Sequence, residues 1–408
     1  MKQYNKFVPE GVRDILLDEC RARREAQRRF SEIFTRRGYQ EVMTPGLEFY
    51  DLFTLPGAAL RQREMYKSTD CAGRLLVFRP DSTLPIARMA AARLQGHRLP
   101  LRLFYSQTVY RSWPELSGKS HESPQMGVEL LGASGIRADL EVICTAVECL
   151  RAITQDFHLE LGHAGLFQLL VSRLEISPEQ QEEIRATIEA KNYGALGELL
   201  DPLGDRPEAE AIRRLPRLFG GEEVLAQAES WGLKGEGVQP LDYLRELYGA
   251  LKQLGLGHRL MVDLGLVQRN DYYTGIVFGG YVGGSGSQVL TGGRYDRLCG
   301  KFGQPMPAVG FGMDMGSVAG LLEDQLPPVG GADVLVHGEK GQEITAQREM
   351  MRLTAMGLRC ESSVWESQAE AEAYAKEAGI SQIIVVGETL KTIDLGGKDH
   401  EAVENCPH

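Results

Sequence analysis

Two adjacent tyrosines, Tyr272 and Tyr273, follow an aspartate and precede a Thr-Gly pair and the apolar run 276–278. That run has high strand propensity, and neighbouring side chains of a strand face opposite sides of the sheet. We therefore expect one tyrosine hydroxyl to line a pocket, as a hydrogen-bond donor or acceptor, while the other anchors the strand. Taken alone, the segment is better explained as a core strand with two half-buried tyrosines.

A second group of polar side chains lies in a pattern typical of a β-hairpin. The strand 101–105 is followed by a polar loop and by the segment 125–132. Alternation places Gln125 and Glu129 on the same face of that second strand. An amide and a carboxylate on one face indicate a polar binding surface.

The first 325 residues must supply the elements that position these side chains. A short strand at 75–78 leads into the polar turn 81–83, where Ser82 or Thr83 can cap the following helix. Helix signals dominate from about 170 to 255, so we expect a helical insertion there. Near the N-terminus, an apolar stripe at helical spacing predicts a helix that a glycine ends, followed by a strand that stops at a proline: Ala22, Ala26, Phe30, Ile33, Phe34, Gly38 and Pro45.

A change of pattern marks a separate C-terminal domain. Pro327 to Gly331 resembles a linker, and strands and helices alternate after it, which predicts a small α/β domain over 332–408. Residues 331–408 hold 14 Asp and Glu against 7 Lys and Arg. That excess of negative charge makes a poor surface for a polyanion.

Composition narrows the class of protein. The chain of 408 residues has a net charge of −11 and seven cysteines, which favours a cytoplasmic, multidomain protein with reduced thiols. No stretch approaches a membrane span, and the opening residues form no signal peptide. Seven of the eight histidines show no metal-ligand spacing, so no metal and no cofactor are expected: His97, His158, His163, His258, His337, His400 and His408.

These segments together resemble the core of the class II aminoacyl-tRNA synthetases, and specifically the histidyl-tRNA synthetases and their non-synthetase relatives. The helix ending at Gly38 is similar to motif 1, residues 105–132 to motif 2, and residues 307–312 to the start of motif 3. Asp271 to Gly275 and Gly292 to Asp296 are similar to signatures of the histidyl branch. The resemblance implies an α+β fold with an antiparallel sheet over residues 1–325, and a C-terminal domain resembling an anticodon-binding module.

The resemblance implies a pocket for histidine. Asp81 and Thr83, with Gln125, correspond to positions that surround the α-amino group, and Asp81 is one methylene shorter than the glutamate of the family. Glu129 and Tyr273 correspond to positions that grip the imidazole. Arg111, the retained arginine of motif 2, and Tyr272 complete the expected histidine-binding set.

The positions that handle ATP depart from the family's pattern. Trp113 replaces a glutamate, and Lys119 and His121 stand where motif 2 has arginines. Ser123 replaces the phenylalanine that stacks on adenine. Ser317 replaces an arginine of motif 3, and Gln268 replaces the arginine that bridges the substrate carboxylate and the α-phosphate. These degenerate adenylation positions imply that no catalytic residue is retained.

Three interpretations stay open. The first is a regulatory subunit of ATP phosphoribosyltransferase, which lacks its own catalysis, pairs with a short-form catalytic subunit, mediates feedback by histidine and self-associates through motif 1. The second is a divergent histidine–tRNA ligase, which the acidic C-terminal domain disfavours because tRNA binding requires a cationic surface. The third is a histidine-binding module with another partner.

Overall fold

The computed structural model describes residues 4–57, 60–114, 118–231, 239–266, 272–283, 288–327 and 330–396. The chain divides into two units, Met1–Leu326 and Pro327–His408. Within those described ranges, no helix has both the length and the hydropathy needed to cross a membrane.

A nine-stranded sheet, counted over the described residues, is the framework of the first unit; its order is β1-β5-β6-β12-β11-β10-β7-β9-β8. Neighbouring strands are antiparallel except in the pairs β1–β5 and β7–β9. The strands are β1 (Gln40–Glu41), β5 (Leu101–Tyr110), β6 (Glu122–Leu131), β7 (Phe157–His163), β8 (Phe219–Gly220), β9 (Leu260–Asp263), β10 (Ile276–Val282), β11 (Gln288–Arg294) and β12 (Ala308–Asp314). A smaller sheet, ordered β2-β4-β3, contains β2 (Leu47–Phe49), β3 (Lys67–Thr69) and β4 (Leu75–Phe78).

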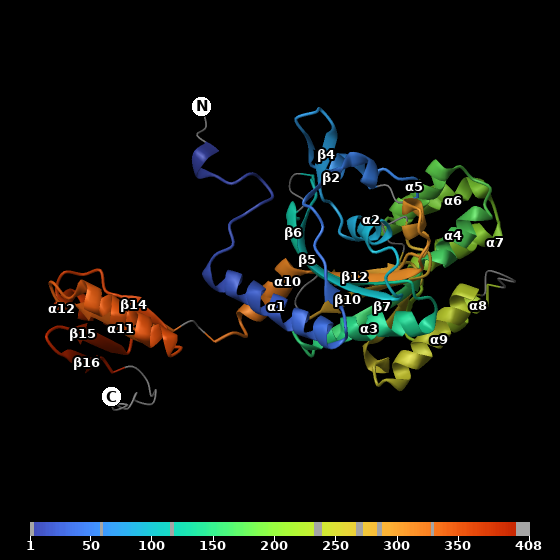
Figure 1. The fold of residues 1–408 in the computed structure, drawn as a ribbon. Helices are drawn as coiled ribbons and strands as arrows, with labels where there is room; N and C mark the ends of the chain where they lie inside the picture. Colours follow the sequence, from blue (N-terminus) through green and yellow to red (C-terminus); the bar gives the residue numbers. More distant parts are fainter. Residues whose placement is uncertain are drawn as a thin grey trace. The chain divides into compact units, whose positions relative to one another are not determined.

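Three helices pack against one another and cover one face of the large sheet: α1 (Leu17–Arg36), α3 (Ile136–Arg151) and α10 (Met315–Glu323) (Figure 1). The predicted stripe of α1 is confirmed, because Ala22, Ala26, Phe30 and Phe34 are buried. Gly38 follows the helix with φ +80°, a conformation that glycine adopts without steric cost. The strand predicted up to Pro45 is shorter, since only Gln40 and Glu41 pair with β5.

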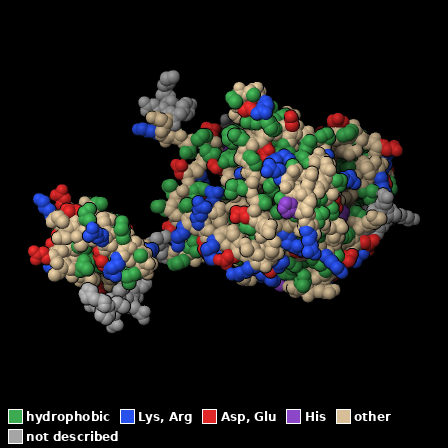
Figure 2. Space-filling view, in the orientation of Figure 1, with side chains coloured by type: hydrophobic (Ala, Val, Ile, Leu, Met, Phe, Trp, Pro, Cys, Tyr) green, Lys and Arg blue, Asp and Glu red, His purple; other side chains and the backbone are tan. Residues whose placement is uncertain are grey.

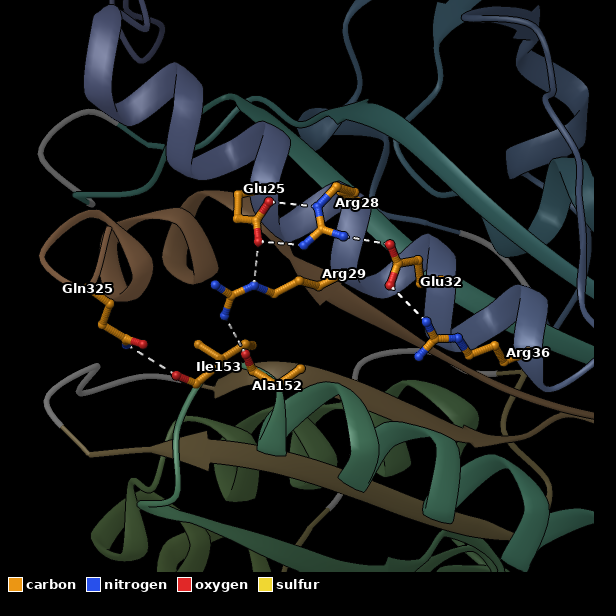
Figure 3. A network of polar contacts seen from close by, with 8 residues as sticks. All are labelled: Glu25, Arg28, Arg29, Glu32, Arg36, Ala152, Ile153 and Gln325. Atoms are coloured by element: carbon orange, nitrogen blue, oxygen red, sulfur yellow. Dashed lines mark hydrogen bonds and ion pairs between the residues drawn. The ribbon is translucent and has the colours of Figure 1, made fainter. Parts of the chain in front are cut away.

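Polar contacts on α1 hold this layer together (Figure 3). Arg29 Nη1 donates a 2.8 Å hydrogen bond to the carbonyl of Ala152, just after α3. Gln325 Nε2, after α10, donates to the carbonyl of Ile153 at 3.1 Å. The helices therefore meet around the end of α3. Along the outer face of α1 run alternating charges that pair with one another: Glu25, Arg28, Arg29, Glu32 and Arg36.

The two faces of the sheet differ in chemistry because side chains alternate along each strand. Met126, Val128 and Leu130 of β6 join the core under the helices. The hairpin of β5 and β6 predicted from the sequence is confirmed, with Gln107 opposite Gln125. Gln125 and Glu129 lie on the other face and line a cavity. The helix α2 (Thr83–Arg93) packs on this second face within a separate apolar cluster.

The segment between β7 and β9 is mainly helical. It contains α4 (Ala164–Ser172), α5 (Pro178–Glu189), α6 (Tyr193–Leu200), α7 (Pro207–Arg214), α8 (Glu223–Glu229) and α9 (Gln239–Gln253). Ser177 and Gln180 form the predicted capping box at the start of α5. This part of the chain packs into the same core as the sheet, through side chains such as Leu170, Leu244 and Leu251.

The second unit contains a four-stranded sheet in the order β14-β13-β15-β16. The first three of these strands are parallel, which matches the predicted α/β pattern, and β16 is an antiparallel strand that the sequence did not indicate. The elements are β13 (Val334–Gly338), α11 (Glu343–Ala355), β14 (Cys360–Ser362), α12 (Gln368–Glu377), β15 (Gln382–Val386) and β16 (Leu390–Asp394). The likeness of this unit to an anticodon-binding module stays a prediction.

Candidate histidine site

A cavity of about 350 Å³ lies on the face of the sheet opposite α1, α3 and α10. This volume is in the range of small-molecule sites. All seven residues assigned to a histidine site line it: Asp81, Thr83, Arg111, Gln125, Glu129, Tyr272 and Tyr273. They come from separate parts of the chain, namely the start of α2, the hairpin and the segment before β10.

Glu129 is the buried carboxylate at the centre of the cavity wall, with 1% of its surface exposed. Thr83 Oγ1 donates a 2.8 Å hydrogen bond to Glu129 Oε1, and the Tyr295 hydroxyl donates to Oε2. Burial raises the pKa of Glu129 to about 8, although both hydrogen bonds oppose this rise. At neutral pH the free protein therefore holds a proton on this group.

Room for Glu129 is provided by the strand beside it. Gly310 is its direct cross-strand partner in β12. A Cβ atom at position 310 would overlap Glu129 Oε2 and lie 2.5 Å from the carbonyl oxygen of Val128. Only glycine at this position leaves room for the Glu129 carboxyl group.

Asp81 has a structural task that the sequence did not indicate. Its Oδ1 accepts a 2.8 Å hydrogen bond from the backbone N–H of Leu84, so Asp81 caps the first turn of α2. The prediction that Ser82 or Thr83 caps this helix is wrong, because the Thr83 hydroxyl is directed to Glu129 instead. The Tyr272 hydroxyl donates to Asp81 Oδ2 at 3.3 Å, and burial raises the pKa of Asp81.

The paired tyrosines do not lie in a strand, since β10 begins at Ile276. The expectation that strand alternation separates their side chains is therefore wrong, and both Tyr272 and Tyr273, which the expected histidine-binding set includes, border the cavity. Their rings meet edge to face with centroids 5.1 Å apart, and Tyr295 packs on Tyr272 in the same way at 5.8 Å. Burial raises the pKa of Tyr272 and of Tyr295 well above the ordinary value, so both phenols stay neutral hydrogen-bond donors.

An ion pair behind the cavity anchors this aromatic wall. Arg294, which precedes Tyr295, pairs with Asp139 of α3, and the two side chains are 7% and 0% exposed. The Tyr243 hydroxyl of α9 donates to the same carboxylate, and Arg294 Nη1 also donates to Asp296 Oδ1 at 2.8 Å. The network links β11, α3 and the helical segment.

Several residues that line the cavity were missed by sequence reasoning. Tyr105 and Tyr295 lie within the recognised motifs. Gly127 and Gly312, which lie beside the Tyr105 side chain, are the signal in the sequence that could have identified Tyr105. A Cβ at Gly127 or Gly312 would come within 2.9 Å of the Tyr105 hydroxyl. Nothing local in the sequence identifies the lining residues of the helical segment: Ile188, Glu189 and Lys191.

Five of the degenerate adenylation positions line a second cavity of about 770 Å³, which shares five lining residues with the first: Arg111, Gln125, Glu189, Gln288 and Thr291. The residues that line it include Trp113, Lys119, His121, Ser123 and Ser317. Gln268 is outside the described residues.

In this second cavity, the protein's own groups bond to one another. Ser123 Oγ donates to Asp314 Oδ2 at 2.6 Å, and Asp314 Oδ1 accepts from the N–H of Ser317 at 2.7 Å. Lys119 Nζ lies 4.3 Å from the centre of the Trp113 ring. These contacts occupy groups that would otherwise face a nucleotide.

Both ring nitrogens of His121 also form hydrogen bonds with protein groups. Its Nε2 accepts from the backbone N–H of Trp113 at 3.3 Å, so the proton lies on Nδ1, which is bonded to the Tyr66 hydroxyl. Its backbone N–H donates to Gly11 at 2.7 Å. Across the ranges described, no cluster of three or more His, Cys, Asp or Glu side chains is suited to a metal ion.

Comparison with known proteins identifies the class first. Residues 11–318 match the family model described as histidyl-tRNA synthetase. A solved histidyl-tRNA synthetase from Nostoc is 19% identical with a TM-score of 0.75, covers 94% of this chain and 92% of its own, and shows the shared fold. The predicted α+β, class II synthetase-like fold is confirmed.

Relatives with higher sequence identity identify the branch of this family to which the chain belongs. An ATP phosphoribosyltransferase regulatory subunit from Clostridium kluyveri is 37% identical over 381 residues, which cover 92% of this chain and 97% of that protein. A structure described as an ATP phosphoribosyltransferase regulatory subunit/histidyl-tRNA synthetase from Bacillus halodurans has a TM-score of 0.82 and 28% identity, and covers 94% and 99% of the two chains. The chain belongs to the family of ATP phosphoribosyltransferase regulatory subunits.

Proposed function

We propose that this chain is a regulatory subunit without its own catalysis, which supports the ATP phosphoribosyltransferase activity of a short-form catalytic partner. In this role it acts in the first step of histidine biosynthesis and mediates feedback inhibition by binding histidine. The observation that carries the proposal is the contrast between the two cavities. The first is lined by carboxyl, amide and phenol groups of the kinds that bind a small polar ligand, whereas the ATP positions around the second bond to neighbouring protein groups.

The chemistry of the first cavity suits histidine. A free imidazole has a pKa near 6.5, and Glu129 has a pKa of about 8. At neutral pH a protonated Glu129 can donate to the imidazole or transfer its proton and form an ion pair. Asp81 and Gln125 supply acceptors for the α-ammonium group.

Aminoacylation is disfavoured by the same positions. Each preorganised donor lost at developing charge costs about 2.7–4 kcal/mol, or about 10²–10³ in rate. A glutamate, an adenine-stacking ring and several arginines of the family are replaced here. A divergent histidine–tRNA ligase therefore requires a new set of phosphate contacts. The second unit also offers a poor tRNA surface, because Figure 2 shows acidic side chains beside basic ones on its visible face.

Self-association through the motif 1 region is part of the proposal. Leu17 and Met43, at the two ends of this region, are 87% and 76% exposed. The small sheet β2-β4-β3 also exposes Leu47, Phe49 and Phe78. Exposed apolar side chains at this density are typical of a surface that another subunit covers. A change of Met43 to Asp should shift the mass measured by light scattering to that of a smaller species.

The test of the proposed function combines two assays. The purified chain should show no histidine-dependent ATP–pyrophosphate exchange, and mixing it with a short-form ATP phosphoribosyltransferase should raise the partner's activity and make the two co-elute. Measurable exchange would favour the ligase. Neither activation nor co-elution would favour a histidine-binding module with another partner.

The binding of histidine to the first cavity is tested by calorimetry. Wild-type protein should bind histidine, and Glu129→Ala and Tyr273→Phe should weaken the binding. Added histidine should also inhibit the reconstituted complex. Unchanged affinity in both variants would refute the assignment of the cavity.

A further inference from the structure

The helical segment between β7 and β9 contributes one cation to the histidine cavity. Ile188, Glu189 and Lys191, at the end of α5, line a cavity whose other walls come from the sheet, from α2 and from the loops beside them. Lys191 is exposed and lies between α5 and α6. The only two cations among the described residues that line the cavity are Lys191 and Arg111.

The backbone at Lys191 has a conformation that favours glycine. Lys191 has φ +53° and follows the C-cap residue Ala190. Its N–H donates to the carbonyl of Ile188, and the N–H of Asn192 donates to that of Thr187, at 2.9 and 3.1 Å. These are the two bonds of a Schellman motif, in which the left-handed position is usually glycine. A lysine in this left-handed conformation strains the backbone and lowers stability.

The surroundings of Lys191 are acidic. The ammonium group lowers the pKa of Glu160 and of Asp263, although burial raises both overall. Among the described residues, no side chain lies within hydrogen-bonding or ion-pairing distance of its Nζ. Within the described part of the chain, the backbone and long-range attraction hold this cation near the cavity.

Arg111 is less available to a ligand. Its Nε donates to the carbonyl of Pro80 at 2.8 Å, and its charge partly offsets the rise that burial causes in the pKa of Asp81. An amino acid in this cavity also carries a carboxylate, which needs a cation when it leaves water. The resemblance to the synthetases implies that the arginine for this carboxylate corresponds to Gln268 here.

We propose that Lys191 is the cation that binds the carboxylate of the histidine-type ligand, in place of the arginine missing at position 268. The proposal rests on the proposed function and extends its site to the helical segment. A ligand bound in this way would contact the sheet through its imidazole and the helical segment through its carboxylate. It would therefore hold those two parts of the unit together.

The test compares L-histidine with L-histidinol, in which a hydroxymethyl group replaces the carboxylate, by calorimetry on the full chain. Wild type should bind histidine about ten- to a hundredfold more tightly, as expected for one charge-assisted contact. Lys191→Met and Lys191→Gly should bring the ratio of the affinity for histidine to the affinity for histidinol close to one. Both variants should leave the affinity for histidinol unchanged. Lys191→Gly should also melt at a higher temperature than wild type without ligand, because glycine relieves the left-handed strain.

Lys252→Met is the matched control, because Lys252 is an exposed lysine of α9 that pairs with Glu222. It should keep the wild-type ratio. If both Lys191 variants keep the wild-type affinity ratio, or if only Arg111→Met loses it, the assignment of Lys191 is overturned. The proposed function is left intact by either result. A Lys191→Gly protein that melts below wild type would show that the lysine stabilises the fold, which also overturns it. If wild type binds neither ligand, the proposed function fails and this inference fails with it.

Discussion

Thr83 Oγ1 donates a 2.8 Å hydrogen bond to Glu129 Oε1 and so joins the first turn of α2 to the middle of β6. The two residues are 46 positions apart in the sequence. Their contact places the carboxylate between a hydroxyl and a phenol, with Gly310 beneath it. The cavity is thus built around a buried acid that the protein supports from three sides.

The first prediction concerns pH. The pKa of Glu129 is about 8 in the folded chain against 4.5 for the ordinary group, so its stabilising effect is complete below pH 4.5 and is lost as the pH rises through 8. Glu129→Gln cannot ionise. Without histidine it should match wild type near pH 5 and be more stable at pH 8.5 by up to about 4 kcal/mol.

Urea denaturation at the two pH values measures this difference. Glu198→Gln, on the exposed part of α6, is the control and should change stability equally at both. A Glu129→Gln protein with the same loss at pH 5 and pH 8.5 would contradict the buried, protonated acid.

The second prediction concerns Gly310. Gly310→Ala should displace the Glu129 carboxylate, lower stability by about 1–3 kcal/mol through overpacking, and weaken histidine binding at least tenfold. Gly320→Ala in α10 is the matched control, since nothing lies within 4 Å of a Cβ placed there. It should stabilise the protein by about 0.5–1 kcal/mol and leave binding unchanged. Thermal melts and calorimetry test both variants, and normal histidine binding by Gly310→Ala would refute the role of this glycine.

The third prediction concerns Asp314, which caps α10 and accepts from Ser123. Asp314→Ala should lower the free energy of unfolding by about 0.5–2 kcal/mol. Ser123→Ala should cost less, and almost nothing when added to Asp314→Ala, because its partner is already gone. A double-mutant cycle by chemical denaturation measures the coupling. Additive losses would mean that the 2.6 Å contact contributes no stability.

The fourth prediction concerns the Arg294–Asp139 ion pair. Arg294→Met should destabilise the protein by about 3–5 kcal/mol, because it leaves a buried carboxylate without its cation. Adding Asp139→Leu should recover part of that loss. Arg352→Met removes an arginine that is 57% exposed and should cost less than about 1 kcal/mol. Equal losses in the two arginine variants would contradict the structural role of the buried pair.

Local patterns in the sequence predicted much of this fold. The stripe of α1 and its terminal Gly38, the capping box at Ser177 and the alternation of Gln125 and Glu129 all depend on neighbouring residues. These features follow from the 3.6-residue and two-residue periods of helices and strands.

The errors came where contacts distant in the sequence decide the geometry. Thr83 carries a side chain suited to cap α2, but Glu129 competes for its hydroxyl and Asp81 caps the helix instead. Tyr272 and Tyr273 have strand propensity, yet the ladder of β10 begins only at Ile276, where pairing with His163 starts. The part played by Lys191 depends on how α5 packs against the sheet, which no local pattern encodes.

Asp81 both caps α2 and lines the ligand cavity, and these two tasks have a genetic consequence. If histidine restrains the pathway as proposed, cells selected for resistance to a toxic histidine analogue should rarely carry changes at Asp81, since such proteins lose helix stability and become scarce. Resistance should instead arise at positions such as Lys191, where the ligand is lost and the protein persists. The spectrum of spontaneous mutants would then separate the residues that sense the ligand from those that also hold the fold.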